Sequence, residues 1–376
     1  MPTERTITQK PGEDIIIKAP KGYQQTGTIT TDAFKTRTRI PAPTTTATPP
    51  PPPPVEPPPP PSGATNLFGV DFTAQPRSGP EFERMKAAAK GLRSVSMGSV
   101  DGNGGANGAL LAAAYLAAAT GDADLKGEVV KVIADAMAPA AKRGRTLEQA
   151  RNLAPFALAL GALDEHALDT MLRTERDRVM PSQGSVRDCQ RKRPNNWGTC
   201  SGLARVAVDA HIGDIDDLAD AAKVFRGWAG DRAAYTGFTY GSLDWQAQPT
   251  QPVGINGAGA MRGSVLVDGI LPDDQRRQSE HGSKPRFPVY ACENYVWQAA
   301  GEVFMTALIL RANGYPDVFT WADHALQRMY VSLAAHDCEA SGDDAWQYAN
   351  AQMVGVTISH DGYAPGKSAG WTDWLY

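Results

Sequence analysis

The sequence has 376 residues, with 37 Lys and Arg against 41 Asp and Glu, so its formal net charge at pH 7 is −4. This near balance argues against a dedicated nucleic-acid-binding protein, which normally carries a clear basic excess. Hydrophobic residues make up 42% of the chain and charged residues 21%, as in ordinary globular proteins.

Residues 1–40 form a short N-terminal segment with seven basic and four acidic residues, rich in Thr and Ile. Its composition is typical of β-strands, but it offers little volume for a core. The longest apolar run there is Ile15 to Ile17, so no Sec signal peptide is expected. Two interpretations stay open. The segment is an anchoring arm that adds strands to a larger assembly or to copies of itself, or it is a disordered tail.

Residues 41–65 form a proline-rich linker, because 13 of the 29 prolines fall between Pro41 and Pro61. Proline fixes φ and donates no backbone hydrogen bond, so a packed domain does not contain such a run. Polyproline II rises about 3.1 Å per residue, and the 13 residues 49–61 therefore span about 40 Å. We expect the linker to hold the following domain away from whatever the arm binds.

Residues 66–376 are expected to form one mainly α domain. Apolar residues recur at helical spacing, with Gly or Asp between the segments, in residues 79–91, 108–120, 124–142, 146–163, 203–211, 217–230, 294–313 and 321–336. Residues 232–286 and 348–376 are irregular. Helices that follow one another as pairs, with long loops gathered between them, favour an (α/α) toroid or incomplete barrel. No stretch approaches the 18 or so apolar residues of a transmembrane helix.

Four cysteines are too few for a disulfide scaffold, and none belongs to a CxxC pair, so a structural zinc site is not expected. Cys189 and Cys200 are close in sequence. They are interpreted either as a disulfide in an oxidising compartment or as two buried free thiols.

Three clusters of polar and aromatic residues interrupt the alanine-rich background. The first is RKRPNNWGTCSG, residues 191–202; the second runs from Tyr235 to Arg277; the third is YACENYVW, residues 290–297. A similar set, KSAGWTDW, lies near the C-terminus. Polar and aromatic groups on irregular backbone suit a cleft that binds sugar, with aromatic rings stacking on the sugar ring. Each cluster also has a structural interpretation, as helix caps, turns and core aromatics.

Several of these motifs resemble a bacterial group in the alginate lyase family, including phage-borne members. They are RPNNWGT from Arg193, PVGIN from Pro252, VDGI from Val267 with DQRR ending at Arg277, and GWTDW ending at Trp374. The resemblance covers residues 66–376 and leaves out the arm and the linker. It implies an (α/α) toroid whose cleft binds a uronic-acid polysaccharide. It also implies cleavage by β-elimination, without a metal or other cofactor.

The chemistry of β-elimination assigns roles to the matching residues. Neutralising the C6 carboxylate stabilises the enolate-like intermediate, a base removes the C5 proton, and an acid protonates the leaving oxygen. By resemblance, Asn195 and Asn196 neutralise the carboxylate. The family has His after this Asn pair, whereas this chain has Trp197, and His211 is expected to face neighbouring helices. The base is therefore assigned to Tyr240 or Tyr295, with Arg262 lowering the phenol pKa, or to His281.

The candidate catalytic residues are thus Asn195, Asn196, Tyr240, Arg262 and Tyr295. The residues expected to bind the polysaccharide are Arg193, Trp197, Trp245, Arg277, His281, Trp297 and Trp371. An alternative is a non-catalytic carbohydrate-binding or decoration protein of a virion, and a further one is a glycosidase that uses Asp244, Asp268 and Glu293 as acids. Because the substrate lies outside the cell, we expect an extracellular or virion-associated protein with no nucleic-acid or membrane partner.

Overall fold

A computed structural model describes residues 67–100, 103, 105–181, 183–276, 292, 295–364 and 366–376. The predictions for the arm (1–40) and the linker (41–65) lie outside these residues. The chain divides into two compact units, Met1–Pro53 and Pro54–Tyr376, and every described residue belongs to the second.

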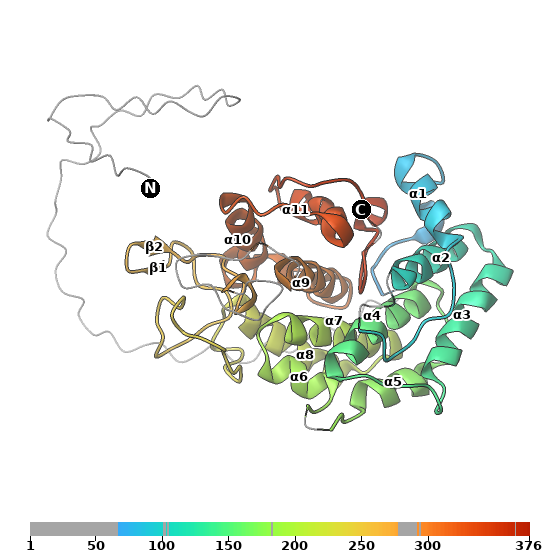
Figure 1. Cartoon of the computed structure of the whole chain (residues 1–376), viewed down its shortest axis with the longest axis horizontal. Helices are drawn as coiled ribbons and strands as arrows, with labels where there is room; N and C mark the ends of the chain where they lie inside the picture. Colours follow the sequence, from blue (N-terminus) through green and yellow to red (C-terminus); the bar gives the residue numbers. More distant parts are fainter. Residues whose placement is uncertain are drawn as a thin grey trace, which may run out of the picture. The chain divides into compact units, whose positions relative to one another are not determined.

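The described part of the chain is mainly α-helical, as expected (Figure 1). Its α-helices are α1 (Pro80–Ala89), α2 (Ala106–Thr120), α3 (Ala123–Met137), α4 (Thr146–Ala162), α5 (Asp169–Asp177), α6 (Val186–Lys192), α7 (Asn196–Ile212), α8 (Ile215–Ala229), α9 (Tyr295–Ala312), α10 (Trp321–Ala335), α11 (Tyr348–Met353) and α12 (Thr372–Leu375). Short 3₁₀ segments are η2 (Phe72–Ala74), η3 (Asp274–Arg276), η4 (Val318–Thr320) and η5 (Gly342–Gln347). Strands β1 (Met261–Arg262) and β2 (Val265–Leu266) form a small antiparallel hairpin.

Four helices, α2, α4, α7 and α9, form the inner layer of the core. α7 packs between α4 and α9, and α2 packs against α4. Their residues are buried on nearly every side of the helix. The sequence explains this, because Ala, Leu and Val surround these helices and alanine lets neighbouring backbones approach closely.

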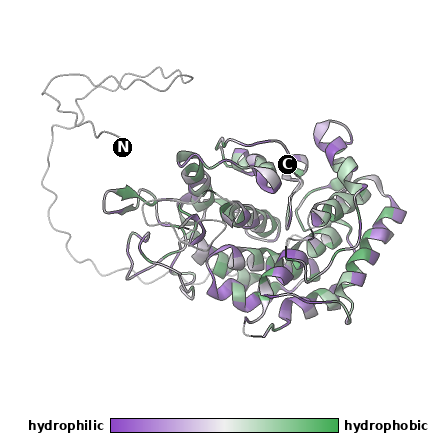
Figure 2. Ribbon diagram, viewed as in Figure 1, coloured by the Kyte–Doolittle hydropathy of each residue, from purple (hydrophilic) through white to green (hydrophobic). Residues whose placement is uncertain are grey.

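Helices α3, α5 and α8 cover the inner layer from outside and bury only one face each. In α3, for example, Val129, Ile133 and Met137 are buried, at helical spacing. Figure 2 shows hydrophilic and hydrophobic residues alternating along α3. From α2 to α5, and again from α7 to α8, an inner helix is followed by an outer one. The short helix α6 packs against α7 and also contacts α4, α5 and α8.

Most predicted helices are confirmed. However, α5 and α6 were not predicted, the short helices α11 and α12 lie in the segment that was expected to be irregular, and α7 begins well before residue 203. The first turns of α7 contain Gly198 and Gly202, which weaken the helical signal. Gly198 is required there by close packing, since a Cβ at this position would lie 1.6 Å from the carbonyl oxygen of Arg193. None of the described helices is long and apolar enough to cross a membrane.

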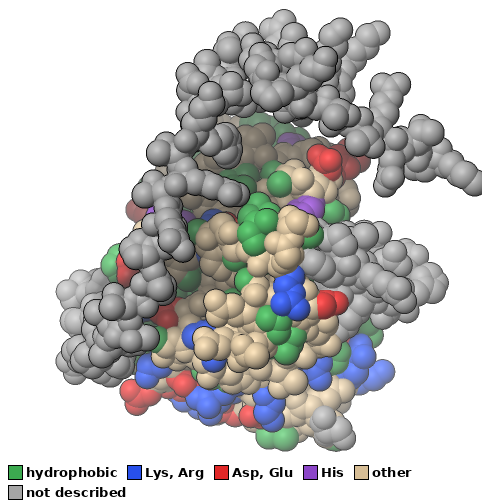
Figure 3. Space-filling model, turned by 90° about the vertical axis from the view of Figure 1, so that its left-hand side faces the viewer, with side chains coloured by type: hydrophobic (Ala, Val, Ile, Leu, Met, Phe, Trp, Pro, Cys, Tyr) green, Lys and Arg blue, Asp and Glu red, His purple; other side chains and the backbone are tan. Residues whose placement is uncertain are grey.

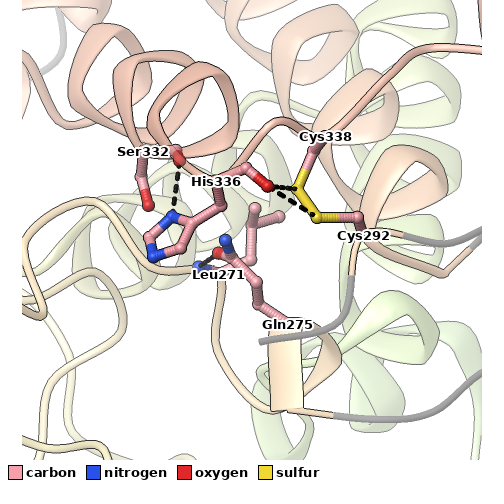
Figure 4. The surroundings of a disulfide bond; sticks show 6 residues. All are labelled: Leu271, Gln275, Cys292, Ser332, His336 and Cys338. Atoms are coloured by element: carbon pink, nitrogen blue, oxygen red, sulfur yellow. Dashed lines mark hydrogen bonds between the residues drawn. A yellow bond between two sulfur atoms is a disulfide. The ribbon is translucent and has the colours of Figure 1, made fainter. Parts of the chain in front are cut away.

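A disulfide joins Cys292 to Cys338, whereas Cys189 and Cys200 are free, buried thiols. The expected alternative of a Cys189–Cys200 bridge is thus corrected: the Cys189 thiol instead donates to the carbonyl oxygen of Trp197. The bridge links the segment before α9 to the segment after α10. Figure 4 shows it beside His336, whose carbonyl oxygen lies 3.5 Å from Cys292 Sγ.

Candidate functional site

A cavity of about 280 Å³ lies at the N-terminal ends of three inner helices. Arg145 and Arg151 come from the start of α4, Trp197 from α7, and Tyr295 and Gln298 from α9. Leu147 of α4 and Gly301 and Glu302 of α9 also line it. The remaining lining residues come from the segments before α2 and after α10: Val100, Asp344, Trp346, Gln347, Lys367, Ser368 and Ala369. Since each helix N-terminus carries a partial positive charge, three of them favour an anionic ligand.

Capping hydrogen bonds fix the N-terminal ends of α4 and α7. At α4, the Glu148 carboxylate accepts the backbone N–H of Arg145 at 2.6 Å. At α7, the side chain of Asn195 accepts the N–H of Trp197 at 3.3 Å. The backbone N–H of Asn196 donates to the Asp274 carboxylate. These bonds place Arg145 and Trp197 at the cavity wall.

The three cations of the cavity differ in their partners. Arg145 pairs with Glu148, and Lys367 Nζ lies 2.6 Å from an Asp343 carboxylate oxygen. Arg151 donates instead to the carbonyl oxygen of Val100 at 2.8 Å and to Gln298 Oε1 at 2.6 Å. Within the described residues, Arg151 makes no ion pair with a carboxylate, although its charge acts on the nearby Glu302 carboxyl group and lowers the pKa of that group. When Glu302 is protonated, the charge of Arg151 is available to a ligand.

Two carboxyl groups that line the cavity, those of Glu302 and Asp344, have raised pKa values. Glu302 is buried, and desolvation raises its pKa to about 7, although Thr199 and Gln298 donate to its oxygens at 2.8 and 3.0 Å. Burial also raises the pKa of Asp344 to about 7, while nearby Lys367 lowers it. Solvent reaches the half-buried Asp344, which weakens the desolvation there relative to Glu302.

The aromatic wall is built around Trp197. The guanidinium of Arg193 lies 4.5 Å from its ring centroid, and that of Arg145 lies 5.5 Å from it. Cations over an indole face hold the ring in place. Trp346 is buried beneath the cavity, and Tyr295 borders it from the first turn of α9.

Of the candidate catalytic residues, Tyr295 lines the cavity and Asn196 adjoins it. The Asn196 amide donates to Gln298 Oε1 at 3.1 Å, so Gln298 connects Asn196 to Arg151. Of the candidate binding residues, Trp197 lines the cavity and the exposed Arg193 lies against its ring. His211 is buried away from the cavity, as expected.

Asn195 and Tyr240, two further catalytic candidates, make structural contacts. Asn195 acts as the helix cap described above. Tyr240 packs edge-on against Trp245, and burial together with the Asp273 carboxylate raises its pKa. The expected lowering of that pKa by Arg262, which lies in β1, is therefore corrected; Arg232 is the cation that acts on this phenol.

Three tryptophans expected to bind sugar belong to the core instead. Trp245 is fully buried in a small cluster with Val267 and Ile270, and Trp297 and Trp371 are buried in the main core. Trp371 Nε1 donates to the carbonyl oxygen of Gly108 at 3.0 Å. Their large apolar surface is used in packing, which corrects the expectation that they contact the polysaccharide.

The remaining candidates fall in other places. Arg277, His281 and Glu293 lie outside the described residues. Of the acids considered for a glycosidase, Asp244 is exposed, and Asp268 pairs with Arg328. Neither lines the cavity.

The sequence reasoning missed Arg145, Arg151, Glu302 and Asp344; Lys367 belongs to the C-terminal set KSAGWTDW but was not named as a site residue. A signal for two of the missed residues exists, because Arg151 and Glu302 are the charged residues within the mostly apolar sequences QARNLAPFALAL and GEVFMTALIL. A lone charge in a helix that is apolar on all sides indicates a specific partner or a site.

On the face that Figure 3 shows, basic and acidic side chains lie interspersed. An anionic ligand would therefore depend on the local cations of the cavity. No protein-family model matches this chain, and no curated protein matches its sequence.

Proposed function

We propose that this chain is a polysaccharide lyase that cleaves a uronic-acid polysaccharide by β-elimination in the cavity at the start of α4, α7 and α9. The observation that carries the proposal is Arg151, a cation without a carboxylate partner among the described residues, in a cavity faced by three helix N-termini. Such a cavity attracts a carboxylate, and Trp197 offers a ring for stacking on the adjacent sugar.

The proposed reaction uses side chains that border this cavity. Arg151 and the amide of Gln298 or Asn196 bind the C6 carboxylate and disperse the charge that develops when the C5 proton leaves. Tyr295, as the phenolate, takes the C5 proton and then donates that proton to the O4 leaving oxygen as the C4–O bond breaks and a C4=C5 double bond forms, which returns the phenolate. One tyrosine performs both steps when proton and leaving group lie on the same face of the sugar.

The fold supports this proposal at a coarser level. Alternating inner and outer helices, with the inner ones starting at one cavity, suit an (α/α) toroid or incomplete barrel. We propose that architecture for residues 66–376.

The test is incubation of the purified protein with alginate, polyglucuronate and bacterial capsule, while the ultraviolet absorbance of an unsaturated uronate is followed. We expect the absorbance to increase with one polymer. In Tyr295→Phe, the rate of this increase should fall at least about 100-fold. Tyr240→Phe is the matched control and keeps its activity, because Tyr240 packs on Trp245 outside the cavity. Absence of unsaturated product with every uronate polymer would overturn the proposal.

A glycosidase is the second candidate, favoured by two carboxyl groups, Glu302 and Asp344, whose pKa values are both raised to about 7 in one cavity. Near neutral pH each group is then partly protonated, so a state with one carboxylic acid and one carboxylate, the pair needed for hydrolysis, is populated. Hydrolysis produces new reducing ends without ultraviolet absorbance. Measuring both signals on the same digest therefore separates the two reactions.

We also propose that the protein acts outside the cell or on a virion, held by its N-terminal arm. The Cys292–Cys338 disulfide supports an oxidising location. The test is deletion of residues 1–62: loss of co-purification with a particle supports the anchor, and unchanged association refutes it. If the unaltered chain binds polysaccharide but forms no product in any assay, that result would instead indicate the non-catalytic carbohydrate-binding or decoration role.

A further inference from the structure

A second cluster of ligand-type side chains lies at the far end of the inner helices. His166 follows α4, Asp169 begins α5, and His211 lies in the last turn of α7. One potential ligand atom from each residue lies within 4.8 Å of the others. At 1.5 Å of rise per residue, His211 is about 22 Å along α7 from Asn196, so this cluster is separate from the cavity.

The Asp169 carboxylate lies between the two imidazoles. Its Oδ2 is 3.0 Å from His166 Nδ1, and its Oδ1 is 3.1 Å from His211 Nε2. His211 Nε2 also lies 3.1 Å from the carbonyl oxygen of Glu165, in hydrogen-bond geometry. Asp169 Oδ1 is buried and has no hydrogen-bond donor among the described residues. A buried oxygen without a donor therefore faces an imidazole nitrogen, an arrangement that a cation would satisfy.

We propose that His166, Asp169 and His211 bind one zinc ion. Two imidazoles and a carboxylate are a ligand set that Zn²⁺ accepts, with water completing the tetrahedral shell. The side chain of His166 is 54% exposed, so water reaches the site from that side. The ion binds His211 Nε2 in the neutral tautomer that carries its proton on Nδ1, so a proton on Nε2 is given up to solvent and one is taken up at Nδ1.

Ring geometry defines what must move. The two imidazoles are stacked, with centroids 4.6 Å apart and planes 7° apart. In-plane lone pairs of parallel rings do not meet at one ion, so one ring must turn. His211 is held in the core, whereas His166 is exposed, and we expect His166 to rotate. The bound ion would then brace the segment between α4 and α5 against the end of α7.

The test uses the untagged full chain, treated with EDTA and dialysed. Zinc affinity is measured by calorimetric titration with ZnCl₂. The melting temperature is measured separately, with and without zinc. We expect one tight site per chain and a higher melting temperature with zinc. His166→Ala and Asp169→Asn should each weaken this site by at least about 10-fold and remove the thermal shift. His166 is exposed, so its replacement leaves the fold intact.

His324→Ala is the matched control, since His324 is an exposed histidine of α10 outside the cluster. It should bind zinc as the unaltered chain does. Co²⁺ gives a second measurement, because bound cobalt should show visible absorption bands that disappear in His166→Ala. Absence of stoichiometric binding, equal affinity in His166→Ala, or equal loss in His324→Ala would overturn the proposal.

Discussion

Glu302 makes the stability of the domain depend on pH in an unusual direction. Burial raises its pKa to about 7 in the folded chain, above the value of an exposed glutamate. The folded state then binds more protons than the unfolded state between about pH 4.5 and 7, so this group lowers stability as pH rises through that range. Glu302→Gln should therefore raise the unfolding free energy at pH 8 by up to about 3 kcal/mol, with little effect at pH 4.

Urea denaturation at pH 4, 6 and 8 measures this effect. Glu175 provides a control of opposite sign. Burial favours a raised pKa there too, but Arg143 and Arg178 hold the pKa of Glu175 below its usual value. Glu175→Gln should thus lower stability at pH 8, and by less as pH falls below the pKa of an unfolded glutamate. A Glu302→Gln effect that does not change with pH would contradict the prediction.

Residues that line the cavity were predictable only in part. Trp197 and Tyr295 stand out because aromatic and amide residues cluster around them in the sequence. Arg151 and Asp344 lie in unrelated segments, and they meet at one cavity because α7 packs between α4 and α9 and η5 packs against α9. Trp245 and Trp371 show the converse error, because sequence composition does not distinguish a core tryptophan from one in a binding site.

At the scale of elements, α5, α7 and α8 are joined by a buried charge network. Arg205 of α7 is fully buried and donates to Asp217 at 2.9 Å, to Asp220 at 2.7 Å and to Gln190 at 2.9 Å. Arg176 of α5 pairs with Asp209 of α7. Short helices such as α5 have little apolar surface, which is why periodicity failed to predict α5. Ionic contacts with α7 hold α5 in place, although its sequence shows no clear apolar periodicity.

Removing one partner from this network should be strongly destabilising. Arg205→Met removes the fully buried cation that pairs with Asp217 and Asp220, and Arg176 and Arg187 replace it only in part. We expect a loss of about 3 kcal/mol in unfolding free energy. Arg191→Met is the matched control. Arg191 is exposed and pairs with Asp220 at the surface, so its loss should be below about 1 kcal/mol. Urea titrations compare the two variants, and equal losses would show that burial does not matter here.

At the scale of the whole domain, the sequence predicted a mainly α chain because apolar periodicity over long helices is a strong local signal. It did not predict which cysteines pair, since pairing depends on contacts between segments far apart in sequence. Cys292 and Cys338 are 46 residues apart and enclose α9 and α10. The bridge therefore ties an inner helix to the one that follows it.

Loop-closure entropy for 46 residues predicts that this disulfide stabilises the domain by about 4 kcal/mol. The double variant Cys292→Ala with Cys338→Ala should then melt about 10 °C lower by calorimetry. Dithiothreitol should lower the melting temperature of the unaltered chain similarly, and leave that of the double variant unchanged. Cys189→Ala, which removes a free buried thiol, should remain sensitive to dithiothreitol. If the reductant affects the double variant as much as the unaltered chain, the stabilisation does not come from this bridge, and the support it gives to an oxidising location is lost.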